Sequence, residues 1–221
     1  MRILKALAAL LTYPEPALLA ALPDIRGIIE AEKLLGRDDR ARLAALIDDL
    51  AVADPLDAQE RYVELFDRGR ATSLHLFEHV HGEARDRGQA MVDLNALYAR
   101  HGLAIATNEL PDYLPAVLEY LSTRPIEEVR EMLADCAHVL RAVGEALVGH
   151  DSRYGAVLGA LLTIAGEPAF DFQPQPKPHE ARVADTPDID ADWVDEPVIF
   201  GPGCTDVKPK AQVVRFMNKV A

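Results

Sequence analysis

Hydrophobic residues recur every three or four positions from the start of the chain to about residue 165, a spacing typical of amphipathic α-helices. One regular stripe occupies the apolar positions of residues 110–121, which are Leu110, Leu114, Val117, Leu118 and Leu121. No alternating apolar and polar run is long enough to indicate a β-strand. The pattern therefore predicts an all-α domain built as a single helical bundle.

Signals for helix ends divide this domain into segments. A helix with Leu43, Leu46 and Leu50 on one face should end before Asp54, which is placed to cap the next helix with Pro55 at its first position. Residues 85–101 should form another helix that stops at Gly102. A final helix is expected around residues 154–162.

A longer stripe with alternating spacings of four and three runs over residues 129–147. Its members are Val129, Leu133, Cys136, Leu140, Val143 and Leu147. Such a run also occurs in coiled coils, but one isolated run of this length favours a single helix of a bundle, with Cys136 as a small core residue.

The composition changes at Gly166, and eight of the fifteen prolines lie beyond it. Residues 166–207 contain ten acidic and two basic residues. Such a segment buries too little apolar surface to offset the entropy lost on ordering. We therefore expect a helical domain in residues 1–165 and an acidic, proline-rich, largely flexible tail in residues 166–221.

The formal net charge of −13 argues against nucleic acid or anionic lipid as partners and favours a basic peptide. Cys136 and Cys204 form no paired motif, so a disulfide framework or a cysteine metal site is not expected, which fits the cytoplasm. The first residues resemble a signal peptide, but the apolar run is short and ends at Pro14, so they predict a first helix. No apolar run approaches the roughly 20 residues of a membrane span.

Residues 67–94 are the richest in polar chemistry, with three of the seven histidines among many charged residues. His75, Glu78 and His79 match the H-x-x-E-H pattern of some zinc proteases, in which two histidines one helical turn apart bind the metal and the glutamate acts as base. Apolar neighbours and a prompt helix end at Gly82 weaken this hypothesis. A nucleophile elbow and a phosphate-binding glycine loop are both absent from the sequence.

The alternative is a salt-bridge network that pins this segment to the bundle. Buried charges are tolerated when paired, and the segment supplies both signs in similar numbers. The residues expected to form the network are Arg68, Glu78, His79, Glu83 and Arg87. Such a network can also shape the wall of a binding groove, so the structural and functional interpretations overlap.

Several motifs of the chain resemble a known family. These are residues 62–70 (YVELFDRGR), 73–74, 76–83 (LFEHVHGE) and 85–94 (RDRGQAMVDL), with 10–14 (LLTYP), 54–56 (DPL) and 109–115 (ELPDYLP). Together they resemble the NarJ family, the assembly chaperones of respiratory nitrate reductase. The last motif also resembles the acidic-helix motif of the wider group of TorD-like chaperones. The resemblance covers about residues 3–165.

This resemblance implies an all-helical bundle of the TorD-like type that works in the cytoplasm, is not an enzyme and holds no cofactor of its own. Such chaperones bind the N-terminal segment of the apo catalytic subunit, delay membrane docking and permit insertion of the molybdenum cofactor. The implied partners are the catalytic subunit of nitrate reductase and, beyond it, molybdenum cofactor biosynthesis proteins. An acidic helical body suits a basic amphipathic peptide.

We expect the peptide site to draw on two helices that carry these motifs and on the polar segment between them. The candidate residues are Tyr62, Leu65, Phe66, Leu74, Phe77, Glu78, His79, Glu83, Arg87, Asp112, Leu114, Leu118 and Glu119. The apolar members should face one groove or the core beneath it. Two other hypotheses stay open at this point: a zinc-dependent hydrolase that uses His75 and His79, and a helical adaptor with no role in maturation.

Overall fold

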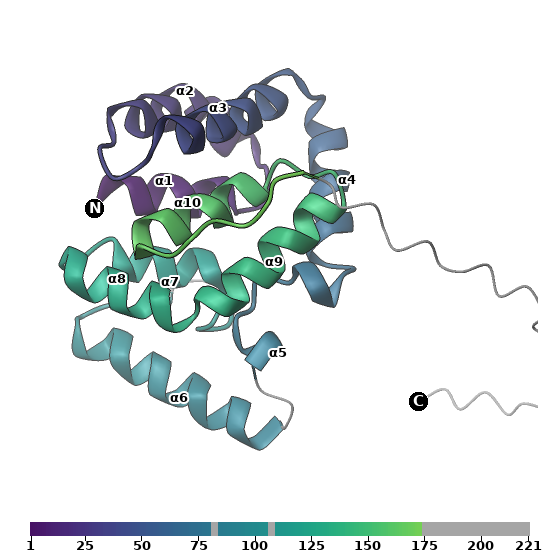
Figure 1. Cartoon of the computed structure of the whole chain (residues 1–221). Helices are drawn as coiled ribbons and strands as arrows, with labels where there is room; N and C mark the ends of the chain where they lie inside the picture. Colours follow the sequence, from purple (N-terminus) through teal and green to yellow (C-terminus); the bar gives the residue numbers. More distant parts are fainter. Residues whose placement is uncertain (81–83, 106–108, 174–221) are drawn as a thin grey trace, which may run out of the picture. The chain divides into compact units, whose positions relative to one another are not determined.

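The computed structural model describes residues 1–80, 84–105 and 109–173, and the elements found there are helical (Figure 1). The α-helices are α1 (Arg2–Leu10), α2 (Pro16–Ala31), α3 (Arg37–Val52), α4 (Pro55–Phe66), α5 (Phe77–Val80), α6 (Ala84–Arg100), α7 (Leu114–Leu121), α8 (Ile126–Asp135), α9 (Ala137–Gly149) and α10 (Gly155–Ala165). A short 3₁₀ helix, η1 (Arg70–Thr72), follows α4. The predicted all-α class is confirmed.

Helix α10 lies at the centre of the bundle because its sequence is apolar on nearly every side. From Gly155 to Leu162 all of its residues are buried, which is the pattern of a helix enclosed by others. It packs against α3, α8 and α9, while α1 packs against α2 and α7. Figure 1 shows α10 between α1 and α9.

The predicted helix ends are largely as expected. The Asp54 side chain accepts a hydrogen bond from the Leu56 N–H at 2.9 Å, with Pro55 at the first helical position. Gly102 follows α6 with φ of +73°, a left-handed conformation that glycine adopts without a steric penalty.

The single helix predicted for residues 129–147 is wrong, because the chain bends at Cys136 between α8 and α9. Cys136 has φ of −100° and ψ of 10°, and its thiol donates to the Met132 carbonyl at 3.3 Å. Val129 and Val143 are both buried, so the apolar stripe continues across the bend. The bend lets each half pack on α10 separately.

The helix expected to include Leu110 also begins later, at Leu114. Pro115 lies in the first turn of α7, where its missing N–H is not needed, whereas inside a longer helix from Leu110 it would cost a backbone hydrogen bond. Leu110 is therefore exposed instead of lying on the buried stripe.

A short strap, residues 167–173, follows α10 and lies against the bundle. Phe170 is buried, and a methyl group added at Gly144 would overlap its ring. The ring of Phe172 meets Gly159 in the same way, and the Arg42 guanidinium lies 4.1 Å from the centre of that ring. Glycines on α9 and α10 thus open slots for the two aromatic rings.

The predicted division near residue 165 coincides with the end of the last helix, although contacts with the bundle extend to Phe172. The expected flexibility of the acidic tail concerns residues 174–221, which lie outside the described residues. In the part of the chain that the structure describes, no helix is long and apolar enough to cross a membrane.

We expect Phe170→Ala to lower the free energy of unfolding by about 3 kcal/mol, because it empties a slot between packed helices. Urea denaturation monitored by circular dichroism measures this change. Ala169→Ser is the matched control, since Ala169 is exposed on the same strap. A loss no larger than that of the control would show that the strap contributes little to the fold.

Candidate functional site

The polar segment identified in the sequence packs against the start of α7 through backbone hydrogen bonds. The Leu114 N–H donates to the Leu74 carbonyl at 2.8 Å, and the Leu76 N–H donates to the Asp112 carbonyl at 3.1 Å. His75 and Tyr113 form an antiparallel bridge between the two stretches. We call the assembly of residues 72–80, residues 110–114 and Arg87 the Asp112 junction.

The Asp112 carboxylate is the centre of this junction and has no exposed surface. It accepts a hydrogen bond from the Phe77 N–H at 3.0 Å, and its other oxygen lies 3.3 Å from His75 Nδ1. A carboxylate without water needs such partners, because burying it unpaired is costly. Because α5 begins at Phe77, the Asp112 carboxylate also accepts the first N–H of this helix, which has no partner within the helix.

Glu78 holds the other side of the segment. Its carboxylate accepts from the Ser73 hydroxyl at 2.6 Å and pairs with Arg87 Nη2 at 3.2 Å, which ties α5 to α6. His79 Nε2 donates to the Ser73 carbonyl at 2.9 Å. Arg70 Nη2 donates to the Glu78 carbonyl at 3.1 Å. These bonds close the loop from η1 to α5 on itself.

These contacts shift two pKa values in opposite directions. The hydrogen bond to Asp112 raises the pKa of His75 against the effect of its partial burial, and nearby acidic residues add to this rise. The hydrogen bond from Ser73, followed by Arg87, lowers the pKa of Glu78. The charged forms of both side chains are therefore favoured in the folded protein.

The two shifts have opposite consequences for stability. The contribution of His75 is complete below the ordinary histidine pKa of 6.5 and is lost as pH rises through its raised value. The contribution of Glu78 is complete above 4.5 and is lost as pH falls through its lowered value. Both ionic contributions are therefore fully present only between these two pH values.

Tyrosine hydroxyl groups connect the junction to neighbouring helices through hydrogen bonds. The Tyr62 hydroxyl donates to the Leu11 carbonyl at 2.9 Å and lies 3.1 Å from the Tyr113 hydroxyl, so α4 is joined to the chain next to Asp112. Burial raises the pKa of Tyr62 well above its ordinary value, and the phenol stays neutral. The Tyr98 hydroxyl donates to the Pro111 carbonyl at 2.8 Å from α6.

The structure separates the predicted site residues into three groups. Glu78, His79, Arg87 and Asp112 meet in the junction, with Leu74 buried beneath them and Phe77 partly exposed. The core contains Tyr62, Leu65, Phe66, Leu114 and Leu118. Glu119 is exposed on α7, and Glu83 lies outside the described residues. A charge placed at Leu114 would therefore test folding before it tested binding.

The structure gives no support to the zinc hypothesis. His75 precedes α5, which begins at Phe77, so the two histidines do not share a helical face. Their ring nitrogens face Asp112 and the Ser73 carbonyl, respectively. Among the described residues, no cluster of three histidine, cysteine or acidic side chains is arranged to hold a metal ion.

Sequence reasoning missed His75 as the partner of Asp112 and missed Tyr98 and Ser73 as supports. His75 and Asp112 are 37 positions apart, and no local pattern indicates that they pair. The high density of polar residues after α4 was a real signal, but it did not identify the partners.

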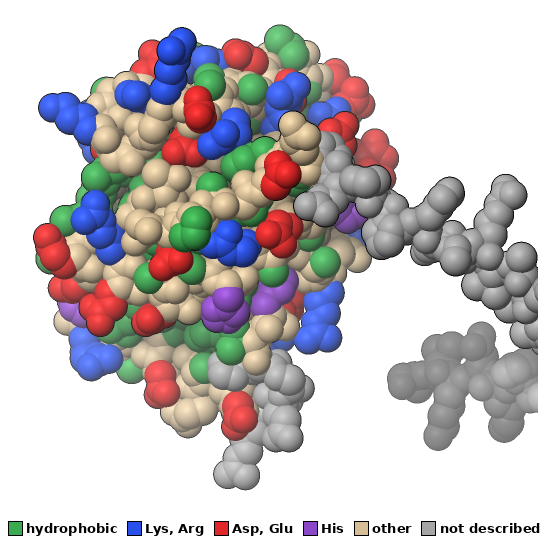
Figure 2. Space-filling view, viewed as in Figure 1, with side chains coloured by type: hydrophobic (Ala, Val, Ile, Leu, Met, Phe, Trp, Pro, Cys, Tyr) green, Lys and Arg blue, Asp and Glu red, His purple; other side chains and the backbone are tan. Residues whose placement is uncertain are grey.

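Some apolar side chains of the junction are exposed. The described part of the chain has seven large exposed hydrophobic residues, and four of them, Val80, Val92, Leu103 and Leu110, lie in the sequence between α5 and the start of α7. Val80 and Leu110 belong to the junction itself, so its surface carries apolar as well as polar groups. Figure 2 shows, by contrast, acidic and basic side chains interspersed over the visible face of the bundle.

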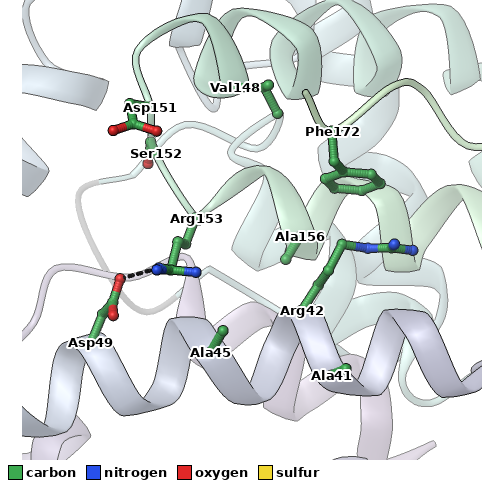
Figure 3. Close-up of a pocket in the computed structure, with 10 residues that line it drawn as sticks. All are labelled: Ala41, Arg42, Ala45, Asp49, Val148, Asp151, Ser152, Arg153, Ala156 and Phe172. Atoms are coloured by element: carbon green, nitrogen blue, oxygen red, sulfur yellow. Dashed lines mark ion pairs between the residues drawn. The ribbon is translucent and has the colours of Figure 1, made fainter. Parts of the chain in front are cut away.

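A hollow of about 550 Å³ lies between α3, the turn before α10 and Phe172 (Figure 3). The Asp49–Arg153 ion pair, at 2.5 Å, borders one end, and Arg42 lies beneath Phe172 at the other. None of the predicted site residues lines it. The candidate site is therefore the Asp112 junction and the apolar side chains that it exposes.

The structure is an all-helical bundle with a hydrogen-bonded polar junction at the start of α7. A family model described as the nitrate reductase delta subunit matches residues 32–158. The chain belongs to this family.

Curated relatives extend the match over most of the chain. NarJ of Escherichia coli (strain K12), named a nitrate reductase molybdenum cofactor assembly chaperone, is 45% identical over 215 residues, which is 96% of this chain and 91% of the relative. NarW of the same strain is 41% identical over 201 residues, covering 90% and 84%. NarJ of Bacillus subtilis (strain 168) is 32% identical over 157 residues, covering 71% and 84%. These relatives are named as chaperones and not as catalysts, which agrees with the prediction that the chain is not an enzyme.

We expect Asp112→Asn to lower the pKa of His75, because the substitution removes the charge that favours the imidazolium ion. NMR titration of the His75 ring measures the shift, and Asp93→Asn on the exposed side of α6 is the control. The same variant should lose about 2 kcal/mol of stability near pH 6 and less at a pH above the raised pKa of His75, where the ring is neutral in both proteins. An unchanged titration would mean that the two side chains are not coupled.

Proposed function

We propose that the chain is an assembly chaperone of respiratory nitrate reductase that acts in the cytoplasm. In this proposal it binds the N-terminal segment of the apo catalytic subunit and supports molybdenum cofactor insertion before the enzyme docks at the membrane. The names of the relatives support the part of this proposal that concerns molybdenum cofactor assembly of nitrate reductase. The peptide segment and the order of events are our inference.

The observation that carries the proposal is a hydrogen-bonded polar junction that also exposes the apolar side chains of Val80 and Leu110. Leu76 of the same junction is partly buried and packs against the core. An amphipathic peptide can bury its apolar face on a surface of this composition.

The junction would give this surface a fixed shape. The Asp112 and Glu78 carboxylates hold the segment before α6 through four hydrogen bonds or ion contacts, so a client would meet an already ordered site. A preformed site avoids the entropy cost of ordering a loop on binding. The net charge of −13 would speed the encounter with a basic segment, and apolar burial would then hold it.

We expect Glu78→Gln to weaken binding of the client's N-terminal peptide about fivefold, equivalent to about 1 kcal/mol. The substitution keeps the side-chain volume but removes the charge that pairs with Arg87, which loosens the link between α5 and α6. Calorimetry measures the affinity, and circular dichroism checks that helicity is retained. Glu127→Gln on exposed α8 is the matched control. Equal affinity in both variants would show that the Glu78 charge has no part in the site.

Salt should also weaken the complex if the client is basic. Exposed charges are screened beyond roughly 10 Å at about 0.1 M ionic strength. We therefore expect a falling affinity for the N-terminal peptide between about 0.05 M and about 0.5 M salt, with a slower association rate as the main cause. A flat response would assign the affinity to apolar contacts alone.

Maturation in cells distinguishes the chaperone from a helical adaptor. Loss of the gene should leave nitrate reductase without its molybdenum cofactor. Normal cofactor content in that strain, with peptide binding intact, would favour the adaptor.

A further inference from the structure

A second hollow lies next to the Asp112 junction, between the end of α6 and α7. Its volume is about 270 Å³. Tyr98, Leu103 and Ile105 line one part of it, and Ala116 and Tyr120 of α7 line another. It is smaller than the roughly 300–1,000 Å³ typical of sites for drug-sized molecules, which suits it to a single large side chain.

The two tyrosines present apolar surface to this hollow because their hydroxyl groups already have partners. Tyr98 donates to the Pro111 carbonyl, and the Tyr120 hydroxyl lies 3.3 Å from His101 Nδ1. Their rings pack together with centroids 5.1 Å apart. An aliphatic or aromatic group would bury its surface against the two rings, and the polar side chains of the hollow belong to other lining residues.

The rim of the hollow carries the exposed carboxylate of Glu119. In the described chain this carboxylate has no ion pair within 4 Å, although Lys5 of α1 lines the same hollow. An unpaired carboxylate beside an apolar cavity favours a ligand with an apolar group and a nearby positive charge. The net charge of −13 favours the same sign of partner.

The hydrogen bond from Tyr98 to Pro111 joins this hollow to the junction, because Pro111 directly precedes Asp112. The wall of the hollow is therefore linked directly to the backbone beside the buried carboxylate. Exposed Leu103 extends the apolar surface at the entrance.

We propose that this hollow is the anchor pocket for the client peptide: it takes one large apolar side chain, and Glu119 pairs with a Lys or Arg next to it. This inference rests on the proposed function, because it names the place where the N-terminal segment of the catalytic subunit is held.

The test is to fill the pocket without touching the junction. Ala116 is partly exposed on α7, so Ala116→Leu should fill the cavity while keeping the helix. We expect at least a tenfold loss of affinity for a synthetic N-terminal peptide of the catalytic subunit, measured by calorimetry on the full chain. Ala96→Leu, on the exposed side of α6, is the control and should bind normally. Thermal melting confirms that both variants fold.

Three further measurements check the result obtained with Ala116→Leu. Leu103→Ser removes an exposed part of the wall and should weaken binding severalfold. In the peptide, replacing the anchoring residue by Ala should weaken binding to the unchanged protein but cause little further loss with Ala116→Leu, as expected for groups in direct contact. Glu119→Gln should weaken binding only for peptides that keep the basic residue.

The outcomes separate the two proposals. If the unchanged protein does not bind the peptide, the proposed function fails. If it binds, but Ala116→Leu and Leu103→Ser bind as well as the control, the peptide is held elsewhere and the anchor pocket is overturned. Additive losses from the peptide and pocket substitutions would likewise overturn it.

Discussion

The fixed shape of the candidate site depends on one buried carboxylate. Asp112 is fully enclosed, and its oxygens reach the backbone N–H of Phe77 and the ring of His75. A negative charge in this position is tolerated only while these partners stay in place, because each lost partner leaves part of the desolvation cost unmet. The loop before α6 is therefore specified by a polar constraint, whereas most of the bundle is specified by apolar packing.

This difference between apolar packing in the bundle and polar contacts in the loop explains how much of the structure the sequence could predict. The helices α3, α4 and α10 follow from apolar spacing and from caps such as Asp54, which are local signals. The bend at Cys136 could not be predicted, because the apolar stripe continues through it. The chain bends there so that α8 and α9 each pack on α10. The pairing of His75 with Asp112 could not be predicted for a related reason: the two residues are 37 positions apart, and the local motifs that contain them do not indicate that they pair.

The candidate site shows a similar limit. The polar segment and the motif around Asp112 stood out in the sequence, and the structure places them side by side. However, Leu65 and Leu118 are core residues. Apolar residues of the core and of a surface groove recur at nearly the same spacing along a helix, so the pattern alone does not distinguish them. Exposed apolar residues such as Leu103 and Leu110 were not among the candidates, since periodicity identifies what is buried and not what is left uncovered.

The strap after α10 changes where the folded part of the chain ends. Composition shifts at Gly166, and a shortened protein designed from that shift would stop at Ala165. Such a protein would lack the rings that fill the slots at Gly144 and Gly159 and would expose apolar surface on α9 and α10. It would then be prone to self-association, a defect easily mistaken for a natural oligomer. The shortest version that keeps its slots filled must include Phe172.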